Sequence, residues 1–188
     1  MDSHAPITFS KHHSKLIVGV LDIVKSTELT STLSADEVDS FYTIFLEEFT
    51  RAIFQSGGVV VKNVGDGILF YFTGEPTEAV VVSLGLLELR PHINKRLIGQ
   101  GLPMISYRIS MSFGPVSAMI NSKGSIVDIF GATVSTCAKF NKAAQANSVI
   151  IGEALSEHLE AGRFEVHNAG RYQVRKDFSF PLYEVQLK

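Results

Sequence analysis

Two aspartates stand where their carboxylates could bind a divalent metal ion. Asp22 ends an apolar run that begins at Lys15, and Asp66 lies between two glycines. Mg²⁺ takes carboxylate oxygens as protein ligands and keeps waters or phosphates in the rest of its coordination shell. Each residue also has a structural interpretation, an acid at a strand end for Asp22 and ordinary turn chemistry for Asp66. The pair is a candidate metal site if the fold brings the two side chains together.

The segment after Asp22 could bind an anion. It consists of Ile23, Val24, Lys25, Ser26 and Thr27. If a short helix begins near Ser26, its free backbone N–H groups form an anion site, and Lys25 adds a positive charge. The alternative interpretation is a plain N-capped helix start without a ligand.

Further polar residues follow at spacings that could serve a binding site. Lys62 lies four residues before Asp66 and could bind a ligand. The alternative interpretation is a lysine at a strand end that is only solvated. Asp128 lies at a predicted strand-to-helix junction, where the helix dipole alone favours an acid. Ser135 and Lys139 are four residues apart on a predicted helix and therefore share a face.

The hydrophobic pattern of the sequence predicts the strands and helices that hold these residues in place. Residues 15–22 are apolar at nearly every position, which predicts a strand buried on both faces. Ser34 and Glu37 form a capping box that starts a helix, and Gly57 with Gly58 ends it.

Hairpins and short helices make up the rest of the chain. Residues 59–61 and 68–72 read as strands around the turn Gly65-Asp66-Gly67. Residues 107–113 and 116–120 predict a second hairpin that turns at Gly114-Pro115. The other predicted elements are a buried helix over 77–89 that Pro91 kinks or ends, a helix over 131–144, a strand over 149–151, a short helix over 153–159, and one or two strands between 164 and 185.

The order of these elements is β-α-β-β-α-β-β-α-β-α-β-β. Helices mixed with hairpins exclude a purely parallel sheet. We predict an α+β fold with a ferredoxin-like βαββαβ core and a C-terminal extension. In such a sheet the first strand lies beside the first hairpin, so Asp22 and Asp66 can approach each other.

Composition narrows the class of protein. The chain has 188 residues, of which 45% are hydrophobic and 19% charged, as in one globular domain. A net charge of −2 disfavours binding to nucleic acid through phosphate neutralisation. The single cysteine, Cys137, cannot form an internal disulfide, and no apolar run reaches the roughly 20 residues of a membrane span. We expect a cytoplasmic protein with an N-terminal tail over residues 1–13 and one domain over 14–188.

The motifs, taken in order, resemble one known family. They are D-I-V-K-S-T from Asp22, K-N-V-G-D-G from Lys62, R-I-S-M-S-F-G-P-V from Arg108, and D-I-F-G-A-T-V-S-T-C-A-K-F from Asp128. Residues 174–185 are similar to an L-K-G-F…P…Y-E-V ending. From about Lys15 to the C-terminus, this arrangement resembles the class III nucleotide cyclase catalytic domain, that of adenylate and guanylate cyclases.

The resemblance implies a head-to-tail homodimer that converts ATP into 3′,5′-cyclic AMP and pyrophosphate. By the same resemblance, Asp22 and Asp66, with Ile23 beside the first, would bind two Mg²⁺ or Mn²⁺ ions. The backbone of residues 23–27 would cradle the phosphates, and Lys176, which matches the lysine of the L-K-G-F ending, would reach the terminal phosphates. A solvated strand lysine is the alternative interpretation of Lys176.

The facing chain would complete each site. In the family, a lysine and an aspartate read adenine, and these match Lys62 and Asp128. An asparagine that orients the ribose and an arginine that binds phosphate are usual where this chain has Ser135 and Lys139. Serine has a shorter reach than asparagine, and lysine lacks the planar fork of arginine. Both residues keep polar or cationic character, and we expect retained activity.

Three other functions remain open on the sequence. A catalytically weak or silent domain that binds nucleotide as a regulatory module is favoured by Ser135 and Lys139, whereas the Asp22/Asp66 pair argues against it. A cyclase that uses another nucleoside triphosphate is the second. A diguanylate-cyclase or polymerase palm shares the two-metal chemistry, but the second acid of its G-G-D-E-F turn is missing after Asp66.

Overall fold

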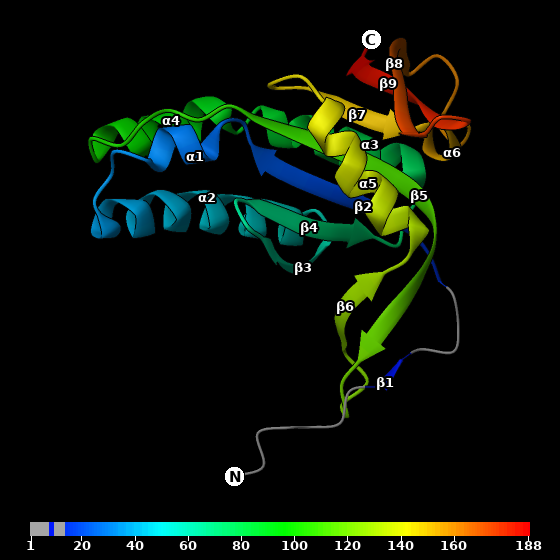
Figure 1. Ribbon diagram of the computed structural model, residues 1–188, viewed down its shortest axis with the longest axis horizontal. Coiled ribbons are helices and arrows are strands. Elements are labelled where there is room, and N and C mark those ends of the chain that lie inside the picture. Colours follow the sequence, from blue (N-terminus) through cyan, green and yellow to red (C-terminus); the bar gives the residue numbers. More distant parts are fainter. Residues whose placement is uncertain (1–7, 10–13) are drawn as a thin grey trace.

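The computed structural model describes residues 8–9 and 14–188 (Figure 1). The elements are β1 (Thr8–Phe9), β2 (Ser14–Ile23), α1 (Ser26–Thr30), α2 (Ala35–Gln55), β3 (Val59–Val64), β4 (Gly67–Phe72), α3 (Pro76–Leu87), α4 (Arg90–Gly99), β5 (Tyr107–Ile120), β6 (Ile126–Phe130), α5 (Ala132–Ala143), β7 (Val149–Gly152), α6 (Glu153–Ser156), β8 (Phe164–Arg175) and β9 (Phe178–Leu187). Apart from β1, the predicted tail over residues 1–13 lies outside the described residues.

The strands form one mixed sheet in the order β3-β4-β2-β5-β7-β9-β8. Strand β2 lies between β4 and β5 and is antiparallel to both, whereas β5 and β7 are parallel. The first βαββαβ portion therefore has the predicted ferredoxin-like pairing, and β7, β9 and β8 extend the sheet beyond it. The far half of β5 pairs with β6 and β1 and projects from the body of the domain (Figure 1).

Helices cover both faces of the sheet. One core packs α2, α3 and α4 against side chains such as Ile17 and Leu21 of β2. On the opposite face, α5 packs against Leu16 and Val18 of the same strand and buries Cys137. Alternate side chains of β2 thus enter different cores, which confirms the prediction of a strand buried on both faces.

Several local predictions are confirmed. Helix α2 begins after the N-cap Ser34, whose capping box with Glu37 is complete. Strands β3 and β4 form the first predicted hairpin. The buried helix over 77–89 ends at Leu87, and α4 begins at Arg90 with Pro91 in its first turn, where the missing N–H costs nothing. The predicted helix over 153–159 is shorter and ends at Ser156.

The second hairpin was placed wrongly. Residues 107–120 form the single strand β5, which continues through Gly114 and Pro115. Pro115 pairs with Lys15 near the start of β2, and this register places it inside the strand. The hairpin turns instead at residues 121–125, where Asn121 Oδ1 accepts hydrogen bonds from the N–H groups of Lys123 and Ser125. The turn is therefore stabilised by the side chain of Asn121, and Gly114-Pro115 does not form one.

Candidate active site

Asp22 is held near the end of β2 by pairing on both sides. Its register partners are Gly67 of β4 and Arg108 of β5. Because Asp22 lies in the second-last position of a central strand, its side chain is only half-buried while its backbone is fixed by two neighbours.

The turn Gly65-Asp66-Gly67 brings Asp66 to the same place. Gly65 has φ 63°, a left-handed conformation that glycine adopts without steric cost. A Cβ on Gly67 would lie 2.6 Å from the carbonyl oxygen of Leu21, so only glycine allows β4 to approach β2 this closely. The two glycines therefore have separate roles, one forming the turn and one allowing the approach. The predicted proximity of Asp22 and Asp66 is confirmed.

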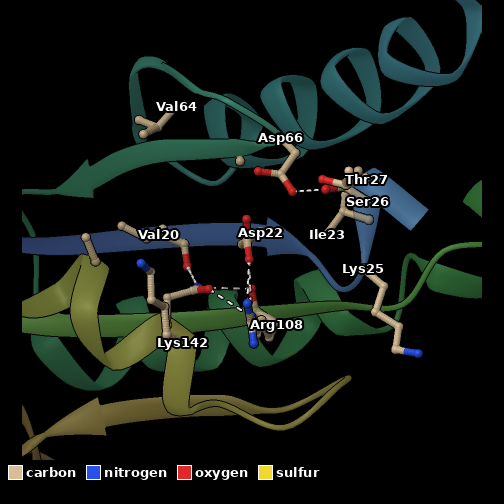
Figure 2. Close-up of a pocket in the computed structure, with 13 residues that line it drawn as sticks. Val20, Asp22, Ile23, Lys25, Ser26, Thr27, Val64, Asp66, Arg108 and Lys142 are labelled. Carbon is tan, nitrogen blue, oxygen red and sulfur yellow. Dashed lines mark hydrogen bonds and ion pairs between the residues drawn. The ribbon is translucent and has the colours of Figure 1, made fainter. Parts of the chain in front are cut away.

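Both carboxylates line one pocket of about 400 Å³ (Figure 2). Ser26 Oγ donates a hydrogen bond to Asp66 Oδ2, which fixes that carboxylate at the pocket wall. Within residues 8–9 and 14–188, no cluster of three or more His, Cys, Asp or Glu residues could hold a metal ion. A site of two carboxylates leaves several coordination positions for water or phosphate oxygens. That donor set fits Mg²⁺ better than a metal that needs a full set of protein ligands.

Arg108 forms an ion pair with Asp22 at the same wall. Its Nη2 lies 2.9 Å and its Nε 3.2 Å from Asp22 Oδ2. Nε also donates to Asn141 Oδ1 at 3.0 Å, and Asn141 Nδ2 donates to the carbonyl of Val20 at 2.8 Å. This network links β2, β5 and α5 and fixes the orientation of the Asp22 carboxylate.

The pKa of Asp22 is raised above its ordinary value. Burial is the main cause, and the nearby charge of Asp66 adds to it, while the hydrogen bond from Arg108 acts in the opposite direction. A bound cation would stabilise the ionised form of this carboxylate, which burial makes costly in the metal-free protein. Carboxylates with perturbed pKa values are common at functional sites.

The segment after Asp22 wraps the pocket with four of its five residues. Ile23, Lys25, Ser26 and Thr27 line it, whereas the N–H of Val24 donates to the carbonyl of Ser106 at 2.8 Å and is therefore engaged within the chain. The predicted short helix is α1, and its N-cap is Lys25, which has the unusual φ of 59°. The Lys25 side chain points away from both aspartates and pairs with Glu28 at 3.1 Å (Figure 2).

The predicted adenine-reading residues lie together elsewhere. Lys62 Nζ is 2.5 Å from Asp128 Oδ2, and the pair joins β3 to β6. The other oxygen of Asp128 accepts a hydrogen bond from the N–H of Ile129 at 2.8 Å. Neither residue lines the Asp22/Asp66 pocket. One chain therefore presents two separate groups of polar residues.

The remaining predicted residues are exposed and also lie outside this pocket. Ser135 and Lys139 are on the solvent-accessible side of α5. Lys176 lies in the turn between β8 and β9. From α5, the pocket is lined instead by Ala138, Asn141 and Lys142.

Sequence reasoning missed Arg108, Asn141 and Lys142 as pocket residues. A signal for Arg108 was present, because it is the one charged residue in the 14-residue strand β5. Lys142 follows Ala138 by four residues and so lies one turn further along the same side of α5. Nothing in the sequence showed which side of α5 faces Asp22, because that depends on how the helix packs across the sheet.

Known proteins share both sequence and fold with this chain. Residues 9–185 match the model of the adenylate and guanylate cyclase catalytic domain. An adenylate cyclase of Streptomyces coelicolor is 26% identical over 145 residues, 77% of this chain and 34% of that protein. The photoactivated adenylate cyclase subunit beta of Euglena gracilis is 37% identical over 62 residues, 33% of this chain and 7% of that protein. The chain thus spans about a third or less of the curated relatives that it matches.

Solved structures share the fold. The guanylyl cyclase Cya2 superposes with a TM-score of 0.80 at 19% identity, over 93% of this chain and 92% of that one. The adenylyl cyclase CyaB from P. aeruginosa superposes with a TM-score of 0.80 at 20% identity, over 94% of this chain and 96% of that one. No helix among the described residues is long and apolar enough to cross a membrane. Because residues 9–185 of the 188-residue chain match the family model, the chain belongs to the adenylate and guanylate cyclase catalytic domain family, the class III nucleotide cyclases.

Proposed function

We propose that this domain converts ATP into 3′,5′-cyclic AMP and pyrophosphate. One observation carries the proposal: Asp22 and Asp66, 44 positions apart in the sequence, line one pocket together with residues of the 23–27 segment. The ribose 3′-oxygen would attack the α-phosphorus, the bond from that phosphorus to the β-phosphate oxygen would break, and the 3′-hydroxyl proton would pass to solvent. Reaction at phosphorus needs positioning and charge neutralisation above all.

Asp22 and Asp66 would hold the two Mg²⁺ or Mn²⁺ ions that the family uses, with Ile23 beside the first aspartate. Such ions lower the pKa of a bound hydroxyl and neutralise phosphate charge. The hydroxyl of Ser26 orients Asp66, and Arg108 orients Asp22 and adds positive charge at the pocket wall. The backbone of residues 23–27, apart from the engaged N–H of Val24, would contact the phosphates.

A head-to-tail homodimer would complete the site. The Lys62–Asp128 pair and the Ser135/Lys139 face lie outside the Asp22/Asp66 pocket of the same chain, which supports their use by the other chain. Lys62 can donate to adenine N1, and Asp128 can accept from the N6 amine. Guanine presents an O6 acceptor and an N1–H donor instead, so this pair favours ATP over GTP. Lys176 would approach the terminal phosphates.

A nucleotide-binding regulatory domain is the second candidate function. It is favoured by Ser135 and Lys139, because neither supplies the amide or the planar guanidinium that the family uses to stabilise the transition state. Loss of one preorganised donor typically costs about 10²–10³ in rate. Such a protein would bind ATP without measurable turnover.

Product analysis separates these functions. The purified protein is incubated with ATP, GTP, CTP or UTP and Mn²⁺, and cyclic nucleotides are identified by mass. We expect 3′,5′-cyclic AMP and pyrophosphate in equal amounts. Formation of another cyclic nucleotide in preference would overturn the choice of ATP, and tight ATP binding without any cyclic product would support the regulatory domain.

A further inference from the structure

Lys142 places a third cation in the pocket that holds the two aspartates. The pocket is lined by the carboxylates of Asp22 and Asp66 and by three basic residues, Lys25, Arg108 and Lys142. In Figure 2, Lys142 lies on the α5 side of the pocket with Arg108 nearby, while Asp66 and Ser26 are on the other side of Asp22. The basic residues outnumber the acids, which indicates a ligand with several negative charges.

The other two cations are already engaged. Arg108 pairs with Asp22 at 2.9 Å and also donates to Asn141. Lys25 pairs with Glu28, and its side chain points away from the aspartates. Among residues 8–9 and 14–188, no hydrogen bond or ion pair engages the Lys142 side chain, so its ammonium group keeps all three donors for a ligand.

Of two lysines on helix α5, Lys142 lines the Asp22/Asp66 pocket and Lys139 does not. Lys142 and Ala138, four residues apart, both line the pocket, and the small side chain of Ala138 leaves room beside it. Lys139, only three residues before Lys142, is exposed and does not line the pocket. If each site combines the Asp22/Asp66 pocket of one chain with the Ser135/Lys139 face of the other, Lys139 and Lys142 of the same chain therefore serve two different nucleotides.

We propose that Lys142 contacts the phosphates of the nucleotide bound by Asp22 and Asp66 of its own chain. This inference rests on the proposed function, because it assumes that the pocket takes a nucleoside triphosphate. Lys142 would supply in cis part of the positive charge that Lys139, without a planar fork, supplies less effectively from the facing chain. It acts as a point charge on phosphate oxygens and needs no fixed bidentate geometry.

Binding of a substrate analogue that cannot react tests the contact directly. 3′-Deoxy-ATP lacks the attacking hydroxyl, so its dissociation constant with Mg²⁺ can be measured by calorimetry without turnover. We expect Lys142→Ala to raise this constant about tenfold, as for loss of one charge-assisted hydrogen bond. Lys142→Arg, which keeps the charge, should bind almost as the wild type does. Lys95→Ala, which removes an exposed lysine of α4 outside the pocket, is the matched control and should change nothing.

A probe without a base separates phosphate contact from indirect effects. Inorganic tripolyphosphate with Mg²⁺ should lose affinity for Lys142→Ala by a factor similar to that for 3′-deoxy-ATP. Equal binding of both probes by the wild type and Lys142→Ala would overturn this inference alone. Failure of the wild type to bind 3′-deoxy-ATP at all would overturn the proposed function and this inference with it.

Heterodimers test whether Lys142 acts in cis. Chains carrying Asp66→Ala are paired, through two affinity tags, with chains carrying either Lys139→Ala or Lys142→Ala. In the first pairing, one site combines an intact pocket with an intact facing chain, so its KM for ATP should equal that of the wild type. In the second, the intact aspartates share a chain with the missing Lys142, so KM should stay about tenfold higher. A wild-type KM in the second pairing would place Lys142 in the facing chain and refute the inference.

Discussion

Arg108 and Asp22 form an ion pair between neighbouring strands, with Arg108 Nη2 2.9 Å from Asp22 Oδ2. The two residues are direct partners in the β2–β5 register, so the backbone itself sets their separation. Asn141 holds the guanidinium from α5. The candidate metal ligand is therefore kept in one orientation by three elements.

Replacing either aspartate should abolish cyclase activity while leaving the fold intact. Asp22→Ala and Asp66→Ala each remove one of the two carboxylates of the pocket, and no third acid there can take its place. We expect a loss of at least about a hundredfold in kcat/KM, measured with Mn²⁺–ATP. Asp39→Ala, an exposed acid of α2, is the control and should have no effect. Activity near the wild-type level in either pocket variant, with unchanged circular dichroism, would refute the metal assignment.

The stability of the metal-free protein should depend on Asp22 in a defined pH window. Its folded-state pKa is raised above 3.8, so folding favours the protonated form. The contribution of Asp22 to the free energy of unfolding is therefore fully present below the pKa that Asp22 has in the unfolded chain. It is lost as the pH rises through the higher pKa of the folded protein. Asp22→Asn imitates the protonated state and keeps an oxygen for Arg108, so it should escape this loss. Thermal unfolding in EDTA between pH 3.5 and 7, chosen to span roughly that window, should give a Tm difference that grows with pH in favour of Asp22→Asn. A difference that stays constant would contradict the raised pKa.

The Lys62–Asp128 pair should set the preference for the base. Lys62→Ala and Asp128→Ala each remove one hydrogen-bonding partner of adenine and also break the 2.5 Å ion pair between β3 and β6. We expect the ratio of kcat/KM for ATP to that for GTP to fall about tenfold in each variant. Lys95→Ala serves as the control. If the wild type prefers GTP, or if the ratio does not change, the pair does not read the base.

Restoring the residues usual in the family should increase turnover. Ser135→Asn extends the reach toward the ribose, and Lys139→Arg adds a second parallel N–H for phosphate oxygens. Both positions are exposed on α5, so the larger side chains meet no buried neighbour within the chain. Steady-state kinetics should show a higher kcat with little change in KM, because these contacts form mainly in the transition state. Lower turnover in both single variants and the double variant, with the fold intact, would show that Ser135 and Lys139 are adapted to this site.

The buried thiol should be inert in the native protein. Cys137 is fully buried, and burial raises its pKa to about 12. Its Sγ lies 3.2 Å from the carbonyl of Ser110 and 3.3 Å from that of Val18. Because the thiolate is the reactive form, a thiol reagent at pH 8 should label Cys137 only as fast as the domain unfolds. Rapid labelling of the native domain, at a rate independent of denaturant, would contradict this assignment.

The sequence by itself determined the local elements whose signals lie within a few residues. The capping box of Ser34 and Glu37, the turn at Gly65-Asp66-Gly67 and the doubly buried strand before Asp22 are all present as predicted. Each depends on backbone conformation or side-chain periodicity that neighbouring residues fix. The approach of Asp22 to Asp66 followed from those elements, because a first strand beside a first hairpin leaves few other arrangements.

Only the tertiary structure decided the rest of the pocket. Gly114-Pro115 is a turn signal in the sequence, yet pairing with β2 keeps both residues inside β5. This continuous strand and the packing of α5 across it place Arg108, Asn141 and Lys142 in the pocket and leave Ser135 and Lys139 outside it. Which side of a helix faces a site depends on contacts between residues far apart in the chain. The spacing of residues within the helix does not specify those contacts.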